Sequence, residues 1–357
     1  MITKQERIAG CLLGGAAGDA LGAPVEFMPL DRIRQEYGET GIQHYGSAYG
    51  RIGAITDDTQ MTIFTFEGML RLFNRDSLNS ADEFCRLMLH AYIRWLETQG
   101  ESSYTPHTKD IYNGWLRDQN ELHSRRGPGG TCLSALSAHL RSISETGSYI
   151  KTAYDSPINN SKGCGGVMRS APVGFFENIS NPFDMGCLSA AITHGHPSGY
   201  LAAGFLSNMI KLILEEKTLE ESIEHSIRIL ETYQNNEECL RAVENALLAA
   251  KETEPTPENI EKLGGGWVAE EALAISLYCA LKAHDFAHGI QLAVNHTGDS
   301  DSTGAITGNI LGALWGKQAI PAEFLKNLEL RELLEEMAQD MFSINGDEKW
   351  WKKYPGC

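Results

Sequence analysis

The stretch His296-Thr-Gly-Asp-Ser-Asp-Ser-Thr-Gly304 sets two carboxylates, Asp299 and Asp301, two positions apart among small and hydroxyl side chains. An apolar run with helical spacing follows directly, so we expect a helix to begin here. Carboxylate and hydroxyl oxygens are the ligands that Mg²⁺ and Ca²⁺ prefer. Two carboxylates do not complete such a site, so the stretch predicts a hard-cation site whose other ligands come from elsewhere in the chain.

A second acidic stretch, Thr56-Asp57-Asp58-Thr59, lies far upstream and also precedes a helical pattern. Thr is a good N-cap and acidic residues are favoured in a first helical turn, so simple helix capping is the more common reason for such a pattern. The alternative is that the two acidic stretches meet in one metal site. In that case both belong to one domain, because a division between them would separate the ligands.

Composition limits the classes of partner. The chain has 357 residues, 42% of them hydrophobic and 22% charged, and a formal net charge of −17. The charge argues against nucleic acid as the main partner, because phosphate backbones are bound by clustered Lys and Arg. No apolar run suits a membrane span, since the best one, 8–25, carries Asp19 and several glycines. With no leader-like run and no Cys-x-x-Cys pair, we expect a cytoplasmic protein with reduced thiols.

Apolar residues recur at helical spacing along most of the chain, and hardly any segment alternates with period two. The sequence therefore predicts an all-α fold, a single compact domain over 1–357 with about a dozen helices and a docked aromatic tail at the C-terminus. Residues 38–55 are expected to form a loop, and Thr131 to cap a helix. The glycines of the first predicted helix, 4–22, cost helix propensity and indicate that another backbone approaches closely.

Four further features could serve a ligand. Glu26 lies among apolar residues and is either a surface carboxylate or a catalytic one with a raised pKa. The Gly-rich segment 159–170 can offer backbone amides to a phosphate, although it matches neither nucleotide-binding glycine pattern. His194, in Thr-His-Gly-His, fits a loop hydrogen bond or a ligand contact better than a zinc site. Trp267 either packs or stacks on a flat ring.

Five motifs occur in a fixed order, at 18–27, 56–59, 163–170, 193–196 and 298–302. In these motifs the sequence resembles the ADP-ribosylglycohydrolase family, the relatives of the dinitrogenase reductase-activating glycohydrolase. The resemblance covers roughly residues 4–318, and the two acidic motifs together are highly specific to that family. It implies a compact all-α fold of orthogonally packed helices and a binuclear Mg²⁺ centre, with Mn²⁺ as an alternative metal.

The resemblance also implies roles for matching positions. Glu26 corresponds to a carboxylate near the metals that some members use in catalysis, and Asp57 and Asp58 are the other catalytic candidates. Asp301 would bridge the metals, and His194 would lie by the distal part of ADP-ribose. The implied metal ligands are Thr56, Asp57, Asp58, Asp299, Asp301 and Ser302. The implied diphosphate loop contributes Gly163, Gly165, Gly166, Val167 and Met168, and Trp267 is the remaining substrate-binding candidate.

The implied activity is hydrolysis of the bond between ADP-ribose and arginine on a modified protein. Metal pairs clamp neighbouring oxygens such as the ribose hydroxyls, and a carboxylate can stabilise an oxocarbenium-like carbon. Ser302 stands where many relatives have Thr, which resembles members that act on ADP-ribosyl-arginine rather than on ADP-ribosyl-serine. An acidic surface also suits a guanidinium leaving group.

Two other functions stay open. The chain could be an immunity protein that neutralises an ADP-ribosylating toxin, by binding the toxin, by removing its modification, or both. It could also be a metal-dependent phosphoester or nucleotide hydrolase, which uses similar carboxylates. Some family members are lens structural proteins with lost motifs, but the intact acidic set argues against that function here.

Overall fold

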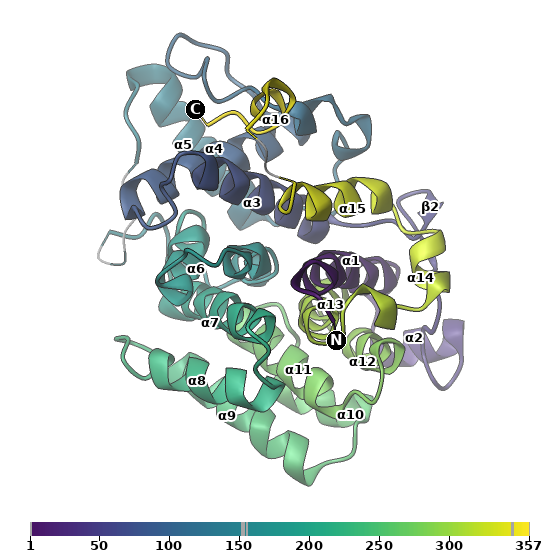
Figure 1. The fold of residues 1–357 in the computed structure, drawn as a ribbon. Helices are drawn as coiled ribbons and strands as arrows, with labels where there is room; N and C mark the ends of the chain where they lie inside the picture. Colours follow the sequence, from purple (N-terminus) through teal and green to yellow (C-terminus); the bar gives the residue numbers. More distant parts are fainter. Residues whose placement is uncertain (1, 151–153, 155, 344–345, 357) are drawn as a thin grey trace.

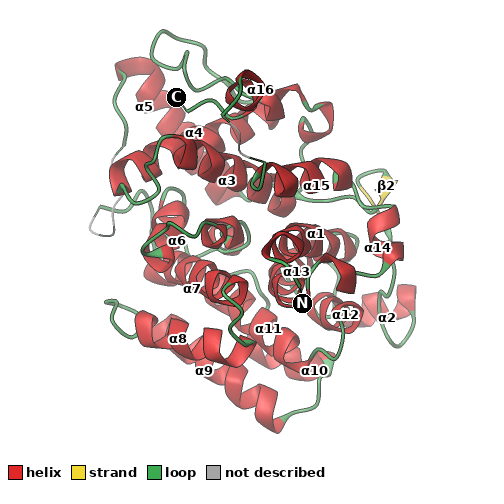
Figure 2. Ribbon diagram, viewed as in Figure 1, coloured by secondary structure: helices red, strands yellow, loops and turns green. Residues whose placement is uncertain are grey.

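Helices dominate the fold, as the sequence predicts, and each of the two described strands is two residues long (Figure 2). The computed structural model describes residues 2–150, 154, 156–343 and 346–356. The helices labelled in Figure 1 are α1 (Lys4–Gly22), α2 (Leu30–Tyr37), α3 (Asp57–Asn74), α4 (Ala81–Thr98), α5 (Gly130–Thr146), α6 (Pro182–Ala191), α7 (Pro197–Leu214), α8 (Leu219–Leu230), α9 (Glu237–Glu252), α10 (Pro257–Ile260), α11 (Ala269–Lys282), α12 (Phe286–Val294), α13 (Ser300–Trp315), α14 (Ala322–Lys326), α15 (Arg331–Asp340) and α16 (Glu348–Lys353).

The centre of the molecule is an antiparallel pair, α1 and α13, formed by segments from opposite ends of the chain (Figure 1). Glycines four residues apart on each helix face one another, so the two backbones touch. A Cβ built on Gly18 would lie 1.9 Å from the carbonyl oxygen of Gly304, and one built on Gly308 would lie 2.0 Å from that of Gly14. The expected close approach of another backbone to α1 is therefore confirmed.

The other helices surround this pair. In Figure 1, α1 and α13 are seen nearly end-on, whereas α3 and α15 run across the view on one side and α7 and α11 lie on the other. Both central helices are buried along most of their length. The N-terminus of α13 therefore lies deep in the molecule, where its acidic residues can be reached by groups from several helices.

Two local predictions differ from the structure. Segment 38–55 contains a small hairpin, β1 (Ser47–Ala48) paired with β2 (Arg51–Ile52), because Tyr49 and Gly50 adopt positive φ and reverse the chain. Gly129, not Thr131, is the N-cap of α5. The glycine pair starts the helix without a side-chain cap, and the Thr131 hydroxyl instead lies 3.1 Å from that of Ser161.

The aromatic tail docks on the body, as predicted. Trp350 donates from Nε1 to Oδ1 of Asn74 at 2.8 Å, and Tyr354 is fully buried with its ring edge against Trp115. Cys357 lies outside the described residues, and the other seven cysteines are free thiols. Within the part of the chain that the structure describes, no helix combines the length and apolar character that a bilayer crossing requires.

Candidate active site

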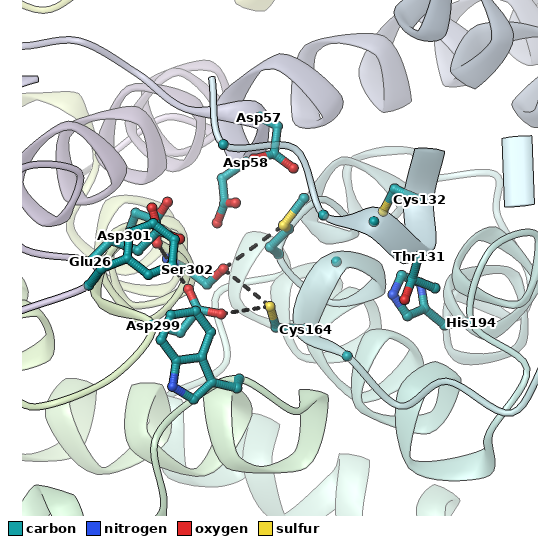
Figure 3. Close-up of a pocket in the computed structure, with 18 residues that line it drawn as sticks. Glu26, Asp57, Asp58, Thr131, Cys132, Cys164, His194, Asp299, Asp301 and Ser302 are labelled. Carbon is teal, nitrogen blue, oxygen red and sulfur yellow. Dashed lines mark hydrogen bonds between the residues drawn. The ribbon is translucent and has the colours of Figure 1, made fainter. Parts of the chain in front are cut away.

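One pocket collects the predicted acidic residues. It is a cavity of about 290 Å³ at the N-termini of α3, α5 and α13, and it is open to solvent. Figure 3 shows carboxylates on one side of it and His194 with Thr131 on the other. Its lining residues are Glu26, Phe27, Asp57, Asp58, Gly127, Gly129, Gly130, Thr131, Cys132, Gly163, Cys164, Gly165, Met168, His194, Trp267, Asp299, Asp301 and Ser302.

The stretch before α13 folds so that its carboxylates face the pocket. Asp299 is the N-cap, and its Oδ1 accepts from the Ser302 amide at 3.4 Å. The Ser302 amide also donates to Oδ1 of Asp301 at 3.0 Å. Asp299, Asp301 and Ser302 are all buried, so few of their oxygens are shared with bulk water. This part of the predicted set is therefore brought together.

The second acidic stretch meets the first from the N-terminus of α3. Thr56 is the N-cap and accepts from the Asp58 amide at 3.2 Å. Thr56 itself is fully buried and does not line the pocket. Burial raises the pKa of Asp301, and hydrogen bonding to Asp299, to the Ser302 amide and to Thr56 lowers it in part. The Thr56-Asp57-Asp58 stretch thus both caps α3 and contributes carboxylates to the shared acidic site.

Glu26 joins this cluster from the turn that follows α1. One carboxylate oxygen each of Glu26, Asp299 and Asp301 lies within 4.8 Å of the others. Burial, followed by the charges of Asp301 and Asp299, raises the pKa of Glu26 to about 10. Glu26 is 8% exposed, so it is not a surface carboxylate, and its catalytic role stays a prediction.

The whole cluster lacks positive charge. None of the lining residues in the described chain is Lys or Arg. Burial and the charge of Asp301 raise the pKa of Asp57 to about 8 and that of Asp19 to about 7, and the pKa values of Asp58 and Asp299 are also raised. Oδ2 of Asp58 is buried without a hydrogen-bond partner among the described residues. These donors fit a hard divalent cation, which would neutralise them and take up the unpaired oxygen.

The pocket is also lined by a Gly-rich turn and by the N-terminus of α5. Gly163 to Gly166 form a tight turn, fixed because the Cys164 amide donates to the carbonyl of Trp267 and Ala269 donates to that of Lys162. Gly129, Gly130 and Thr131 bring the N-terminus of α5 to the same cavity. The first amides of a helix have no acceptor within it, so they favour a bound anion.

His194 lines the pocket beside the Gly-rich turn. Burial, followed by the charge of Arg169, lowers the pKa of His194 to about 3. Its Nδ1 shares a hydrogen bond with the Thr193 hydroxyl at 2.8 Å. Arg169 is turned away from the cavity, over the ring of Tyr92, and donates to Thr193. The predicted Gly-rich segment therefore lines the pocket, while its Arg169 side chain lies in the core. Val167 is fully buried and does not line the cavity, whereas Met168 does.

The structure adds residues that were not singled out from sequence. Asp19 supports the N-terminus of α3, and the Cys164 thiol donates to Oδ2 of Asp299 at 2.8 Å. Phe27 stands at the pocket beside Trp267. The signal for Asp19 was present, since a lone carboxylate in an apolar, Gly-rich helix must be paired when buried. Nothing local marks Phe27, whose neighbour is 240 positions away.

A family model of ADP-ribosylglycohydrolase matches residues 1–350, which is nearly the entire chain. The chain belongs to the ADP-ribosylglycohydrolase family. A solved structure of an ADP-ribosylglycohydrolase-related protein complex shares the fold, with a TM-score of 0.68 at 24% identity, over 96% of this chain and 99% of that one. The resemblance carried by the five sequence motifs is thereby confirmed, as is the all-α fold that it implied.

Similar proteins from several organisms extend over the same length. An uncharacterized protein of Archaeoglobus fulgidus is 30% identical, over 96% of this chain and 97% of its own. ADP-ribosylarginine hydrolase Tri1 of Pseudomonas putida is 24% identical, over 94% and 78%. ADP-ribosyl-[dinitrogen reductase] glycohydrolase of Rhodospirillum rubrum is 23% identical, over 92% of each chain. This ADP-ribosylglycohydrolase is thus similar to hydrolases named for protein-linked ADP-ribose.

Proposed function

We propose that this ADP-ribosylglycohydrolase cleaves the N-glycosidic bond between ADP-ribose and arginine on modified proteins, and so reverses mono-ADP-ribosylation. One observation carries the proposal: buried carboxylates, with no Lys or Arg among the lining residues, share one cavity with a Gly-rich turn and the N-terminus of α5. The acidic side suits a ribose and a cationic leaving group, and the amide side suits a diphosphate. The names of the Pseudomonas and Rhodospirillum relatives support this class of substrate.

The substrate would lie across the cavity with its phosphates against the amides. Gly165 and the start of α5 line the cavity and would offer N–H groups, so the diphosphate needs no Lys or Arg, whereas the Gly163 amide already donates to the Ser161 hydroxyl and Gly166 lies behind the lining. Met168, which lines the cavity, would contact the ribose and phosphates of ADP-ribose. Val167, which is buried in the core, would support the Gly-rich turn. His194, which stays neutral, can hydrogen-bond to the distal part of ADP-ribose without adding charge.

Divalent cations would be held on the acidic side. Thr56, Asp57, Asp58, Asp299, Asp301 and Ser302 are the proposed ligands for two Mg²⁺ ions, with Mn²⁺ as the alternative. When bound, such cations supply Lewis-acid chemistry toward the ribose hydroxyls and water. The grouping of Glu26 with Asp299 and Asp301 supports a role for Glu26 at the same centre.

The chain's own carboxylates would then perform the proton and charge chemistry. Glu26 lies at the solvent side of the cluster, so it would accept the proton of the attacking water once ionised. Asp57 and Asp58 would stabilise the positive charge that develops on the ribose carbon as the guanidine departs. Burial and the neighbouring carboxylates raise the pKa of Glu26, so neutralisation of the cluster would favour its ionised form.

The test is release of free ADP-ribose from an ADP-ribosyl-arginine peptide in Mg²⁺, in Mn²⁺ and in EDTA. Asp301→Ala should reduce release by at least about 100-fold, the usual size of a loss of transition-state charge stabilisation. Asp31→Ala, which removes an exposed carboxylate on α2, should have no effect. Undiminished release by Asp301→Ala would refute the proposal.

The same assay separates the other functions. Inorganic phosphate as the main product would indicate a phosphoester or nucleotide hydrolase. An Asp301→Ala variant that still neutralises an ADP-ribosyltransferase toxin in co-expressing cells would indicate an immunity protein that acts by binding.

A further inference from the structure

Two large aromatic side chains stand at the pocket in contact with each other and outside the core. Phe27 is 74% exposed and Trp267 is 45% exposed. Their ring centroids are 5.6 Å apart with an interplanar angle of 21°, and both residues line the cavity. Exposed apolar side chains beside a polar cavity indicate an interaction site, because binding of a ligand would remove their apolar surface from water.

The pair belongs to the acidic end of the cavity. Phe27 directly follows Glu26 in the chain. A Cβ built on Gly266, next to Trp267, would lie 3.4 Å from Cβ of Asp299. Figure 3 shows Glu26, Asp299 and Asp301 on the side away from Thr131 and His194. If the body of ADP-ribose extends toward His194, the group released from the ribose carbon leaves toward Phe27 and Trp267.

The chemistry around Phe27 and Trp267 favours a planar cation. Aromatic faces attract cations, and the attraction grows where carboxylates exclude anions and the described lining offers no competing Lys or Arg. A guanidinium is planar and weakly hydrated, so it can stack on a ring while its N–H groups face a carboxylate. A serine hydroxyl offers neither the charge nor the flat face.

We propose that Phe27 and Trp267 form the leaving-group subsite of this enzyme, and that their ring faces select the guanidinium of ADP-ribosyl-arginine over a neutral leaving group. The inference rests on the proposed function and extends it from the ADP-ribose half of the substrate to the released half. It assigns specificity to the rim of the pocket, whereas the bond cleavage belongs to the carboxylates.

The experiment compares kcat/KM on an ADP-ribosyl-arginine peptide and on an ADP-ribosyl-serine peptide. Trp267→Leu and Phe27→Leu keep apolar bulk but remove the ring face, and Trp267→Phe keeps a ring. Trp351→Leu is the matched control, since Trp351 has the same 45% exposure but lies on α16 and does not line the cavity. Binding of free ADP-ribose is measured by calorimetry for every variant.

The leucine variants should lose about tenfold in kcat/KM on the arginine substrate, carried mainly by KM, and less than about threefold on the serine substrate. Trp267→Phe should retain most of the preference, and ADP-ribose should bind equally well to all variants. Equal losses on both substrates, or weaker ADP-ribose binding by Trp267→Leu, would overturn the subsite, the latter because the ring then stacks on ADP-ribose itself.

Failure of the proposed function has a different signature. If the unsubstituted protein releases ADP-ribose from the serine peptide but not from the arginine peptide, the hydrolase class stands and the guanidinium subsite is wrong. If it releases none from either peptide in Mg²⁺ or Mn²⁺, the proposed activity is wrong, and the subsite is refuted with it.

Discussion

Thr59 donates two hydrogen bonds to Oδ2 of Asp19, one from its backbone amide at 3.1 Å and one from its hydroxyl at 2.5 Å. The amide of Thr56 also donates to the same carboxylate at 3.0 Å. Asp19 thus holds the start of α3 against α1, and the glycine contacts hold α1 against α13. Through these two contacts, acidic stretches from opposite halves of the chain are fixed around one cavity.

Asp19→Asn should weaken the proposed metal centre, although Asp19 is not one of the proposed ligands. The amide keeps one acceptor oxygen but turns an NH₂ group toward donors, so the start of α3 loses part of its support. Outer groups of this kind typically change metal affinity by about 10- to 100-fold. Calorimetric Mg²⁺ titration should show a loss in that range, with Asp31→Asn unchanged as the control. An unaltered Mg²⁺ affinity in a folded Asp19→Asn protein would contradict this role.

Gly304→Ala should destabilise the fold by separating the central helices. The added Cβ would lie 2.4 Å from the carbonyl oxygen of Gly18, which is backbone and cannot rotate away. Overpacking of a core costs about 1–3 kcal/mol, more than the roughly 1 kcal/mol of helix propensity that alanine gains over glycine. Urea unfolding should therefore show a net loss of stability.

The control is Gly68→Ala in the middle of α3. Its Cβ would meet the Met88 side chain at 3.1 Å and Cβ of Ala91 at 3.2 Å. Met88 can shift, so the stability should stay within about 1 kcal/mol of the natural protein. Equal stability changes for the two alanine variants would show that the backbone contact of α1 and α13 is unimportant.

The metal-free protein should lose stability as pH rises from 6.5 to 8.5. Asp19 and Asp57 have pKa values raised to about 7 and about 8, so in this window the folded state binds more protons than the unfolded state. A raised carboxyl pKa contributes stability that is full below the ordinary pKa of 3.8 and is lost as pH rises from there through the folded pKa, so this window holds the last part of the loss. Thermal unfolding in EDTA should show a falling Tm, by roughly 2 °C for each kcal/mol lost.

Added Mg²⁺ should reverse this trend. Cations bind the ionised carboxylates, so the increase in Tm that Mg²⁺ produces should grow with pH over the same window. Burial raises the pKa of Asp19 and Asp57 most and the charge of Asp301 raises it further, so Asp301→Ala should reduce the slope in EDTA. A Tm in EDTA that rises with pH would contradict the burial of these acids in their protonated form.

Trp350→Ala should cost about 3 kcal/mol of stability, because a large buried ring and its hydrogen bond to Asn74 are lost. The neighbouring Trp351→Ala should cost little, since Trp351 is nearly half exposed. Activity per folded molecule should be unchanged in both, as neither residue lines the pocket. Similar urea midpoints for the two variants would show that the tail is not anchored through Trp350.

The sequence by itself determined the helices and the identity of the reactive groups. Helical spacing and local caps depend on neighbours a few residues apart, so α1, α3 and α13 could be predicted from their own residues. The hydroxyl and carboxylate pairs at Thr56-Asp57-Asp58 and Asp299-Ser300-Asp301 marked oxygen-ligand chemistry for the same reason. The glycines of α1 already indicated that another backbone approaches closely, but only the structure shows that this backbone is α13.

Only the tertiary structure decided which of these groups meet and in what state. The raised pKa of Glu26 comes from burial and from Asp301, a residue 275 positions away in the chain (301 − 26). The start of α5 became part of the pocket wall, and Phe27 met Trp267, through packing that no local pattern encodes. Burial, electrostatic coupling and cavity shape depend on through-space distances between remote segments. Helix packing sets those distances, and it alone turned a series of weak motifs into one site.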